Sequence, residues 1–168
     1  MKGSVKINKR YVPKRLSKKD KIKQVKMIDK SKKMYKNKIY FTRKKLKSFK
    51  SHKSNHITNA QRMYKIDSIM PSKELSKKTK CSIGTLQKIM KKGQGAYFSS
   101  GSRPNQTGHS WGIARLASAI TGGKASAVDY KLLEEGCSKN SKALTLAKRS
   151  KQKYKFGRRK APKTKINL

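Results

Sequence analysis

Residues 95–137 read GAYFSSGSRPNQTGHSWGIARLASAITGGKASAVDYKLLEEGC, and their composition differs from that of the rest of the chain. This stretch holds four basic and three acidic residues, a net charge of +1, within a 168-residue chain whose net charge is +40. It also contains the only tryptophan and seven of the eleven glycines. A requirement other than charge therefore shaped this stretch. We expect residues 93–137 to belong to a folded core, and we call them the signature module.

Glycine spacing and apolar periodicity predict that most of this module is helical. Glycine and proline make residues 93–105 a loop, with its two aromatic side chains directed inward. Apolar and small residues share one face of a helix over residues 111–120, which the next two glycines end. Further helices are predicted over residues 125–135 and 139–148.

Helical spacing continues from the module toward the N-terminus. Residues 58–65 predict a short amphipathic helix, and Ser72 is the expected N-cap of the next one. A further helix is expected over residues 83–90, with Gly93 as its stop signal. The last two helices, joined by a short turn, resemble a helix-turn-helix, although Lys80 stands where that motif often has glycine. An ordinary helical hairpin is the alternative.

The two ends of the chain are strongly basic and poor in apolar residues. Residues 20–33 are a candidate helix and residues 38–42 a candidate short strand or extended anchor, although neither stretch has a convincing apolar period. We therefore expect a mainly α protein, with a helical core over residues 52–148 and long, extended basic arms over residues 1–51 and 149–168. The core would combine the helix-turn-helix-like pair, a glycine-rich loop and two to three further helices. Aromatic residues between the lysines of the N-terminal arm are candidate anchors on the surface of a binding partner: Tyr11, Tyr35, Tyr40 and Phe41.

A net charge of this size attracts polyanions, so nucleic acid is the first partner to consider, with acidic proteins and anionic membranes as alternatives. Double-stranded DNA, bound mostly without sequence preference, is the expected nucleic acid. In a helix-turn-helix the second helix enters the major groove, where glutamine reads adenine and lysines meet phosphates. The candidate contact residues are Thr85, Gln87, Lys88, Lys91, Lys92, Arg103, Arg115, Lys124, Arg158, Arg159 and Lys160.

Catalysis and cofactors are not expected. Seven acidic residues scattered along the chain offer no carboxylate cluster for a metal-dependent enzyme, and no hydrolase motif is present. Cys81 and Cys137 have neither metal-ligand spacing nor a secretory context, so we expect two reduced thiols and no zinc. We also expect no small-molecule substrate and no membrane span, because no apolar run is long enough.

The runs KKGQGAYFSSGSRPNQT at 91–107, SWGIARLAS at 110–118 and GGKA at 122–125 resemble an uncharacterised family of small basic proteins. That family is encoded by large nucleocytoplasmic DNA viruses of algae and protists, with relatives in tailed phages. The similarity extends over about residues 40–137. It implies a viral context and supplies no activity to transfer.

Two functions are expected from these observations. The favoured one is a non-enzymatic virion structural protein, a minor capsid or core component whose arms bind the major capsid protein, other virion proteins or viral DNA. The four aromatic anchors of the N-terminal arm would be its contacts with the capsid. The alternative is a DNA-binding protein that condenses, packages or regulates the viral genome through its basic tails and the helix-turn-helix-like pair. The expected location is the virion, and before assembly the host cytoplasm or a viral factory.

Overall fold

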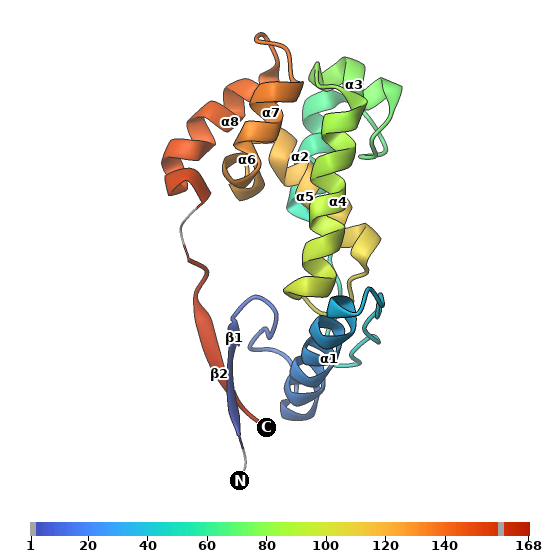
Figure 1. Cartoon of the computed structure of the whole chain (residues 1–168), viewed down its shortest axis with the longest axis vertical. Coiled ribbons are helices and arrows are strands. Elements are labelled where there is room, and N and C mark those ends of the chain that lie inside the picture. Colours follow the sequence, from blue (N-terminus) through green and yellow to red (C-terminus); the bar gives the residue numbers. More distant parts are fainter. Residues whose placement is uncertain (1–2, 158–159) are drawn as a thin grey trace. The chain divides into compact units, whose positions relative to one another are not determined.

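The computed structural model describes residues 3–157 and 160–168 and is mainly helical, as expected (Figure 1). The chain divides into two compact units, each with its own apolar cluster. Unit 1 comprises Met1–His52, Gln94–Trp111 and Lys160–Leu168, and unit 2 comprises Lys53–Gly93 and Gly112–Arg159. The elements are β1 (Ser4–Asn8), α1 (Lys18–Lys36), α2 (Asn55–Tyr64), α3 (Lys73–Thr79), α4 (Ile83–Ser99), α5 (Gly108–Ile120), α6 (Lys124–Val128), α7 (Tyr130–Gly136), α8 (Lys142–Lys153), a 3-10 turn (Lys155–Gly157) and β2 (Lys163–Asn167).

Much of the N-terminal segment that we expected as an extended arm is a 19-residue helix, α1, so that part of the prediction is wrong. The side chain of Ser17 caps this helix by accepting a hydrogen bond from the Asp20 backbone N–H at 3.2 Å. The Asp20 carboxylate also suits the positive end of the helix dipole. Val25 and Ile28 lie on the buried face, so a hydrophobic stripe fixes α1 in unit 1.

The two ends of the chain meet in unit 1 as a two-stranded antiparallel sheet (Figure 1). Strand β1 pairs with β2 so that Val5 lies opposite Ile166. Residues 38–42, which we expected as a short strand or extended anchor, form neither helix nor strand. The apolar cluster of unit 1 draws on β1, the loop after it, α1 and the segment beyond: Ile7, Val12, Leu16, Val25, Met27, Ile28, Leu46 and Phe49.

Unit 2 holds the helices whose prediction was most successful. Helices α2, α3 and α8 lie close to their expected positions, and the Ser72 hydroxyl caps α3 by accepting from the Leu75 N–H at 3.1 Å. Small side chains recur in the apolar cluster of this unit, which allows its short helices to pack closely: Ala60, Tyr64, Ile66, Ile69, Leu75, Cys81, Leu86, Ile89, Leu116, Ala117, Ala119, Ile120, Leu133, Ala143, Leu144 and Ala147. Among the described residues, no helix is long and apolar enough to cross a membrane.

Gly93 does not end a helix, and the predicted loop over residues 93–105 begins too early. Helix α4 continues to Ser99. A Cβ atom at Gly93 would lie only 2.7 Å from the Cα of Gly112 in α5, so glycine is needed where two helix backbones approach each other. The chain turns instead at Gly101, whose φ of 123° is a conformation that glycine adopts readily.

The helix predicted over residues 125–135 is two helices. Helix α6 ends and α7 begins around Asp129, which takes φ −100° and ψ 17°. The Asp129 carboxylate is buried, and it accepts hydrogen bonds from Lys92 and Arg115. The break in the helix therefore coincides with the carboxylate that binds both cations.

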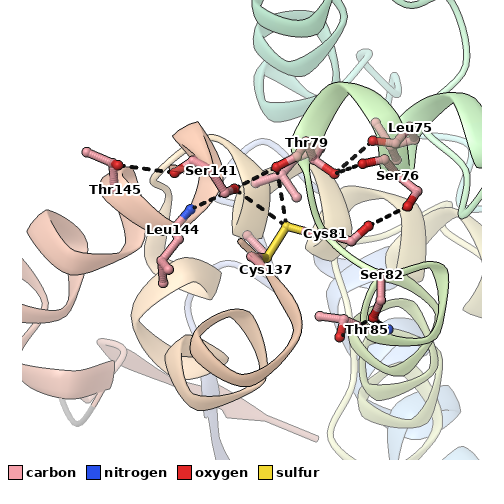
Figure 2. Close-up of a disulfide and its surroundings, with 12 residues drawn as sticks. Leu75, Ser76, Thr79, Cys81, Ser82, Thr85, Cys137, Ser141, Leu144 and Thr145 are labelled. Atoms are coloured by element: carbon pink, nitrogen blue, oxygen red, sulfur yellow. Dashed lines mark hydrogen bonds between the residues drawn. A yellow bond between two sulfur atoms is a disulfide. The ribbon is translucent and has the colours of Figure 1, made fainter. Parts of the chain in front are cut away.

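Cys81 and Cys137 form a disulfide, so the prediction of two reduced thiols is wrong (Figure 2). The bond joins the turn between α3 and α4 to the residue that follows α7. Backbone pairing brings the two cysteines together, because the Ser82 N–H donates to the Gly136 carbonyl and the Ser138 N–H donates to the Lys80 carbonyl, both at 2.8 Å. A separation of 56 residues in the sequence hides this pairing.

Candidate nucleic-acid interface

Unit 1 carries the larger excess of positive charge of the two units. Its segments contain 25 lysines and arginines and only two acidic residues, Asp20 and Asp29. Asp29 pairs with Lys33 at 2.8 Å, in the fully solvated setting where ion pairs contribute little stability. This unit therefore presents a strong positive field to solvent.

Four exposed lysines line one side of α1. Lys19, Lys23, Lys26 and Lys30 follow one another at intervals of four, three and four residues, which places them along one stripe of the helix. We call these four residues the lysine row. With Ile22 and Met27 they line a shallow groove on the helix surface. At 1.5 Å of rise per residue the row extends over roughly 16 Å, the length of several successive phosphates on one DNA strand.

The Asp20 carboxylate, at the start of this row, already accepts hydrogen bonds from a hydroxyl and a backbone N–H, while Asp29, next to Lys30, pairs with Lys33. Asp20 Oδ2 accepts hydrogen bonds from the Ser48 hydroxyl at 2.6 Å and from the Ser48 N–H at 3.0 Å. These bonds, and then the nearby charges of Lys23 and Lys19, lower the pKa of the Asp20 carboxyl. None of the ion pairs among the described residues includes a member of the lysine row.

A buried arginine joins α1 to the signature module within unit 1. Arg43 is 6% exposed, and its guanidinium donates to the Ser31 hydroxyl at 3.1 Å, the Tyr97 carbonyl at 2.9 Å and the Ser102 hydroxyl at 2.7 Å. The guanidinium also lies 3.7 Å from the centroid of the Tyr97 ring, a cation–π contact. Burial lowers the pKa of Arg43, while Tyr97 and Tyr11 oppose that shift.

The loop after α4 is held by further side-chain bonds inside unit 1. Gln24, 1% exposed, donates to the carbonyls of Tyr11 and Ser102. Asn105 accepts from the Leu46 N–H at 2.7 Å and donates to the Phe49 carbonyl at 2.9 Å. These residues of the module act as a packing element that fixes α1 and the segment around residue 46.

Of the DNA contacts predicted on α4, the second helix of the helix-turn-helix-like pair, one is buried and others are exposed. Thr85 is buried, and a Cβ at Gly136 would overlap its side chain, so Thr85 faces α7. Gln87, Lys88 and Lys91 are exposed on α4. In the turn before α4, Lys80 adopts φ 57°, the left-handed conformation for which glycine is usual.

Two predicted phosphate contacts are paired within unit 2. Arg115 donates through Nε and one Nη to both oxygens of Asp129, each at 2.8 Å, and Lys92 donates to the same carboxylate at 2.8 Å. Asp129 is 1% exposed, so the carboxylate of these ion pairs is buried. Of the remaining predicted contacts, Arg103 and Lys160 are exposed. Lys124 is half-buried and has an interaction partner. Arg158 and Arg159 lie outside the described residues.

Most of the aromatic residues predicted as capsid anchors pack within unit 1. The ring of Tyr11 meets Trp111 edge-on at 6.5 Å, and burial raises its pKa. Tyr35 stacks on Phe98, and Phe41 packs against the unit 1 cluster and under Lys30. Tyr40 is the exception, with 67% of its surface exposed.

Sequence reasoning missed the lysine row because it set aside the candidate helix over residues 20–33 for lack of a convincing period and treated the segment as an extended arm. Two signals were present in the sequence: Ser17 followed three residues later by Asp20, and apolar residues at helical spacing at Ile22, Val25 and Ile28. Together they predict a helix, and a helix aligns the lysines. Among the described residues, no three His, Cys, Asp or Glu side chains gather as a metal site.

Comparison with known families matches one family model, over residues 8–142, with the description "family of unknown function (DUF5824)". The matched region includes α1, Arg43 and the whole signature module. Comparisons with curated proteins and with solved structures found no match. Because the family model covers most of the chain, the protein belongs to DUF5824, a family of unknown function.

Proposed function

We propose that this protein is a non-enzymatic nucleic-acid-binding protein whose main phosphate-binding surface is the lysine row of α1. The supporting observation is that four exposed lysines lie along one helix stripe, outside every ion pair among the described residues. An array of this kind binds a regularly charged polymer by releasing its condensed counterions. It makes no demand on base sequence, because phosphates are the same at every step.

The row is better suited to phosphates than the residues proposed on α4. Arg115 and Lys92 already bind the buried Asp129 carboxylate, so using them on DNA would leave that carboxylate without its cations. Thr85 faces the interior of unit 2. Exposed Gln87, Lys88 and Lys91 remain available for additional contacts, and Arg103 and Lys160 add positive charge to unit 1.

The test is a salt titration of the full-length protein on random-sequence DNA. Binding that rests on neutralised phosphates falls linearly in log affinity as log salt rises, with a slope of about −0.9 per phosphate on duplex DNA. We expect a slope steeper than −3, since four aligned lysines contribute. No binding at physiological salt, or a slope near zero, would contradict the proposal.

The second candidate function is a virion structural component that docks on another virion protein. One observation favours it: Ile39 and Tyr40 are large apolar residues that are 50% and 67% exposed and adjacent in the chain. A protein-docking segment uses such residues as anchors. Binding of purified virion proteins that persists at high salt and disappears in an Ile39→Ala, Tyr40→Ala double variant would support this alternative.

A further inference from the structure

Tyr40 is an exposed aromatic ring whose orientation is fixed by two other rings. Its centroid lies 5.2 Å from that of Phe98, at an interplanar angle of 72°, and 6.0 Å from that of Tyr35, at 65°. Tyr35 and Phe98 are themselves stacked at 6.2 Å and 10°. We call these three residues, all in unit 1, the aromatic cluster. Because Tyr40 is 67% exposed although two other rings contact it, the cluster offers solvent a preoriented aromatic surface.

The end of α1 places Tyr40 beside the cluster. Lys38 adopts φ 59°, its N–H donates to the Tyr35 carbonyl at 2.9 Å, and the Ile39 N–H donates to the Met34 carbonyl at 3.0 Å. These two bonds are those of a Schellman motif, which reverses the chain after a helix. The reversal returns Tyr40 to the last turn of α1, where Tyr35 lies.

Positive charge lies beside Tyr35 of the aromatic cluster. Lys32, Lys33 and Lys36 line a shallow hollow together with Tyr35 and Ser99, and Asp29 at its edge is paired with Lys33. The hollow and the lysine row are both on α1. An aromatic ring flanked by lysines is the combination that single-strand-binding proteins use, with bases stacked on rings and phosphates held by cations.

We propose that the aromatic cluster is a base-stacking platform and that the protein prefers single-stranded over double-stranded nucleic acid. This inference rests on the proposed function and specifies its substrate class. In a duplex the faces of the bases are covered by their neighbours, whereas a single strand can turn a base onto Tyr40. Stacking is tolerant of sequence, because every base has a flat π-face.

The test uses the full-length protein and three oligonucleotides of equal length: a single strand, the same strand in a duplex, and a strand whose sugars lack bases. Affinities are measured by fluorescence anisotropy at one salt concentration. We expect the base-bearing strand to bind at least about tenfold more tightly than the abasic strand, since stacking on one ring has an effect of that order. Tyr40→Ala should remove most of this difference.

Two control variants make the result specific. Tyr40→Phe keeps the ring and should keep the difference, and Ile39→Ala removes the adjacent exposed apolar side chain and should leave it unchanged. Equal binding of base-bearing and abasic strands by the wild type, or binding of the duplex as tight as that of the single strand, would overturn the inference while leaving the proposed function intact. A difference that survives in Tyr40→Ala would also overturn it and would leave protein docking as the role of the exposed ring. Failure to bind any of the three oligonucleotides would refute both proposals.

Discussion

The guanidinium of Arg43 donates a hydrogen bond to the Ser102 hydroxyl at 2.7 Å, from a side chain that is only 6% exposed. Its other recorded acceptors, the Ser31 hydroxyl and the Tyr97 carbonyl, are also neutral oxygens. A buried cation of this kind is favourable only while its donors are satisfied. Arg43 is therefore the residue on which the connection between α1 and the signature module most depends.

Replacing Arg43 by methionine should destabilise unit 1 by about 3 kcal/mol, because the buried oxygens of Ser102 and Tyr97 lose their donors. Arg43→Lys should be intermediate, since an ammonium keeps the charge but lacks the planar fork. Trp111, the only tryptophan, lies in unit 1, so its fluorescence reports the unfolding of that unit by urea. Unchanged unfolding of the methionine variant would show that the network does not stabilise the unit.

Asp129→Asn should destabilise unit 2 by about 3 kcal/mol, because a buried carboxylate bound to Arg115 and Lys92 is replaced by a neutral amide. Glu134→Gln is the matched control. Glu134 is exposed and accepts one hydrogen bond from Tyr130, so the change there should stay within about 0.5 kcal/mol. Urea unfolding followed by circular dichroism compares the two variants. Equal effects would mean that the Asp129 ion pairs are no more important than a surface contact.

Arg43 and Asp129 show why the helices were easier to predict from the sequence than the side-chain contacts. Ser72 and the apolar spacing of α8 are local signals, so α3 and α8 could be located from a few neighbouring residues. Arg43 and Asp129 act through partners that are many residues away in the chain, and a single charged residue has no periodicity that reveals burial. Gly93 misled the prediction for a related reason, because its role is to accommodate Gly112 on another helix.

Breaking the disulfide should lower the stability of unit 2 by about 4 kcal/mol, the chain-entropy value for closing a loop of 56 residues. The comparison is between oxidised wild type and a Cys81→Ser, Cys137→Ser double variant in thermal unfolding. DNA affinity should stay the same while the variant is folded, because the lysine row belongs to unit 1. Two free thiols in protein purified without reductant would contradict the assigned pairing.

Asp20 should make the stability of unit 1 sensitive to acid. The hydrogen bonds from Ser48 lower the pKa of Asp20 in the folded protein, so its contribution is fully present above the unfolded value of 3.8 and is lost as pH falls through the lower folded value. Asp20→Asn should flatten the acid limb of a stability–pH curve followed by Trp111 fluorescence. An acid limb that is identical in the variant would assign this sensitivity to other carboxyl groups.

The central claim, that the lysine row is the phosphate-binding surface, is tested most directly by comparing two triple variants of equal charge. One replaces Lys19, Lys23 and Lys26 by glutamine, and the other replaces Lys73, Lys77 and Lys78, three exposed lysines on or at the ends of α3. Salt titrations on the same DNA give the number of phosphates neutralised by each protein. We predict that the first variant loses about two to three units of salt slope and at least about tenfold in affinity, while the second stays near wild type. Equal losses in both variants would contradict the claim and show that only the total charge matters.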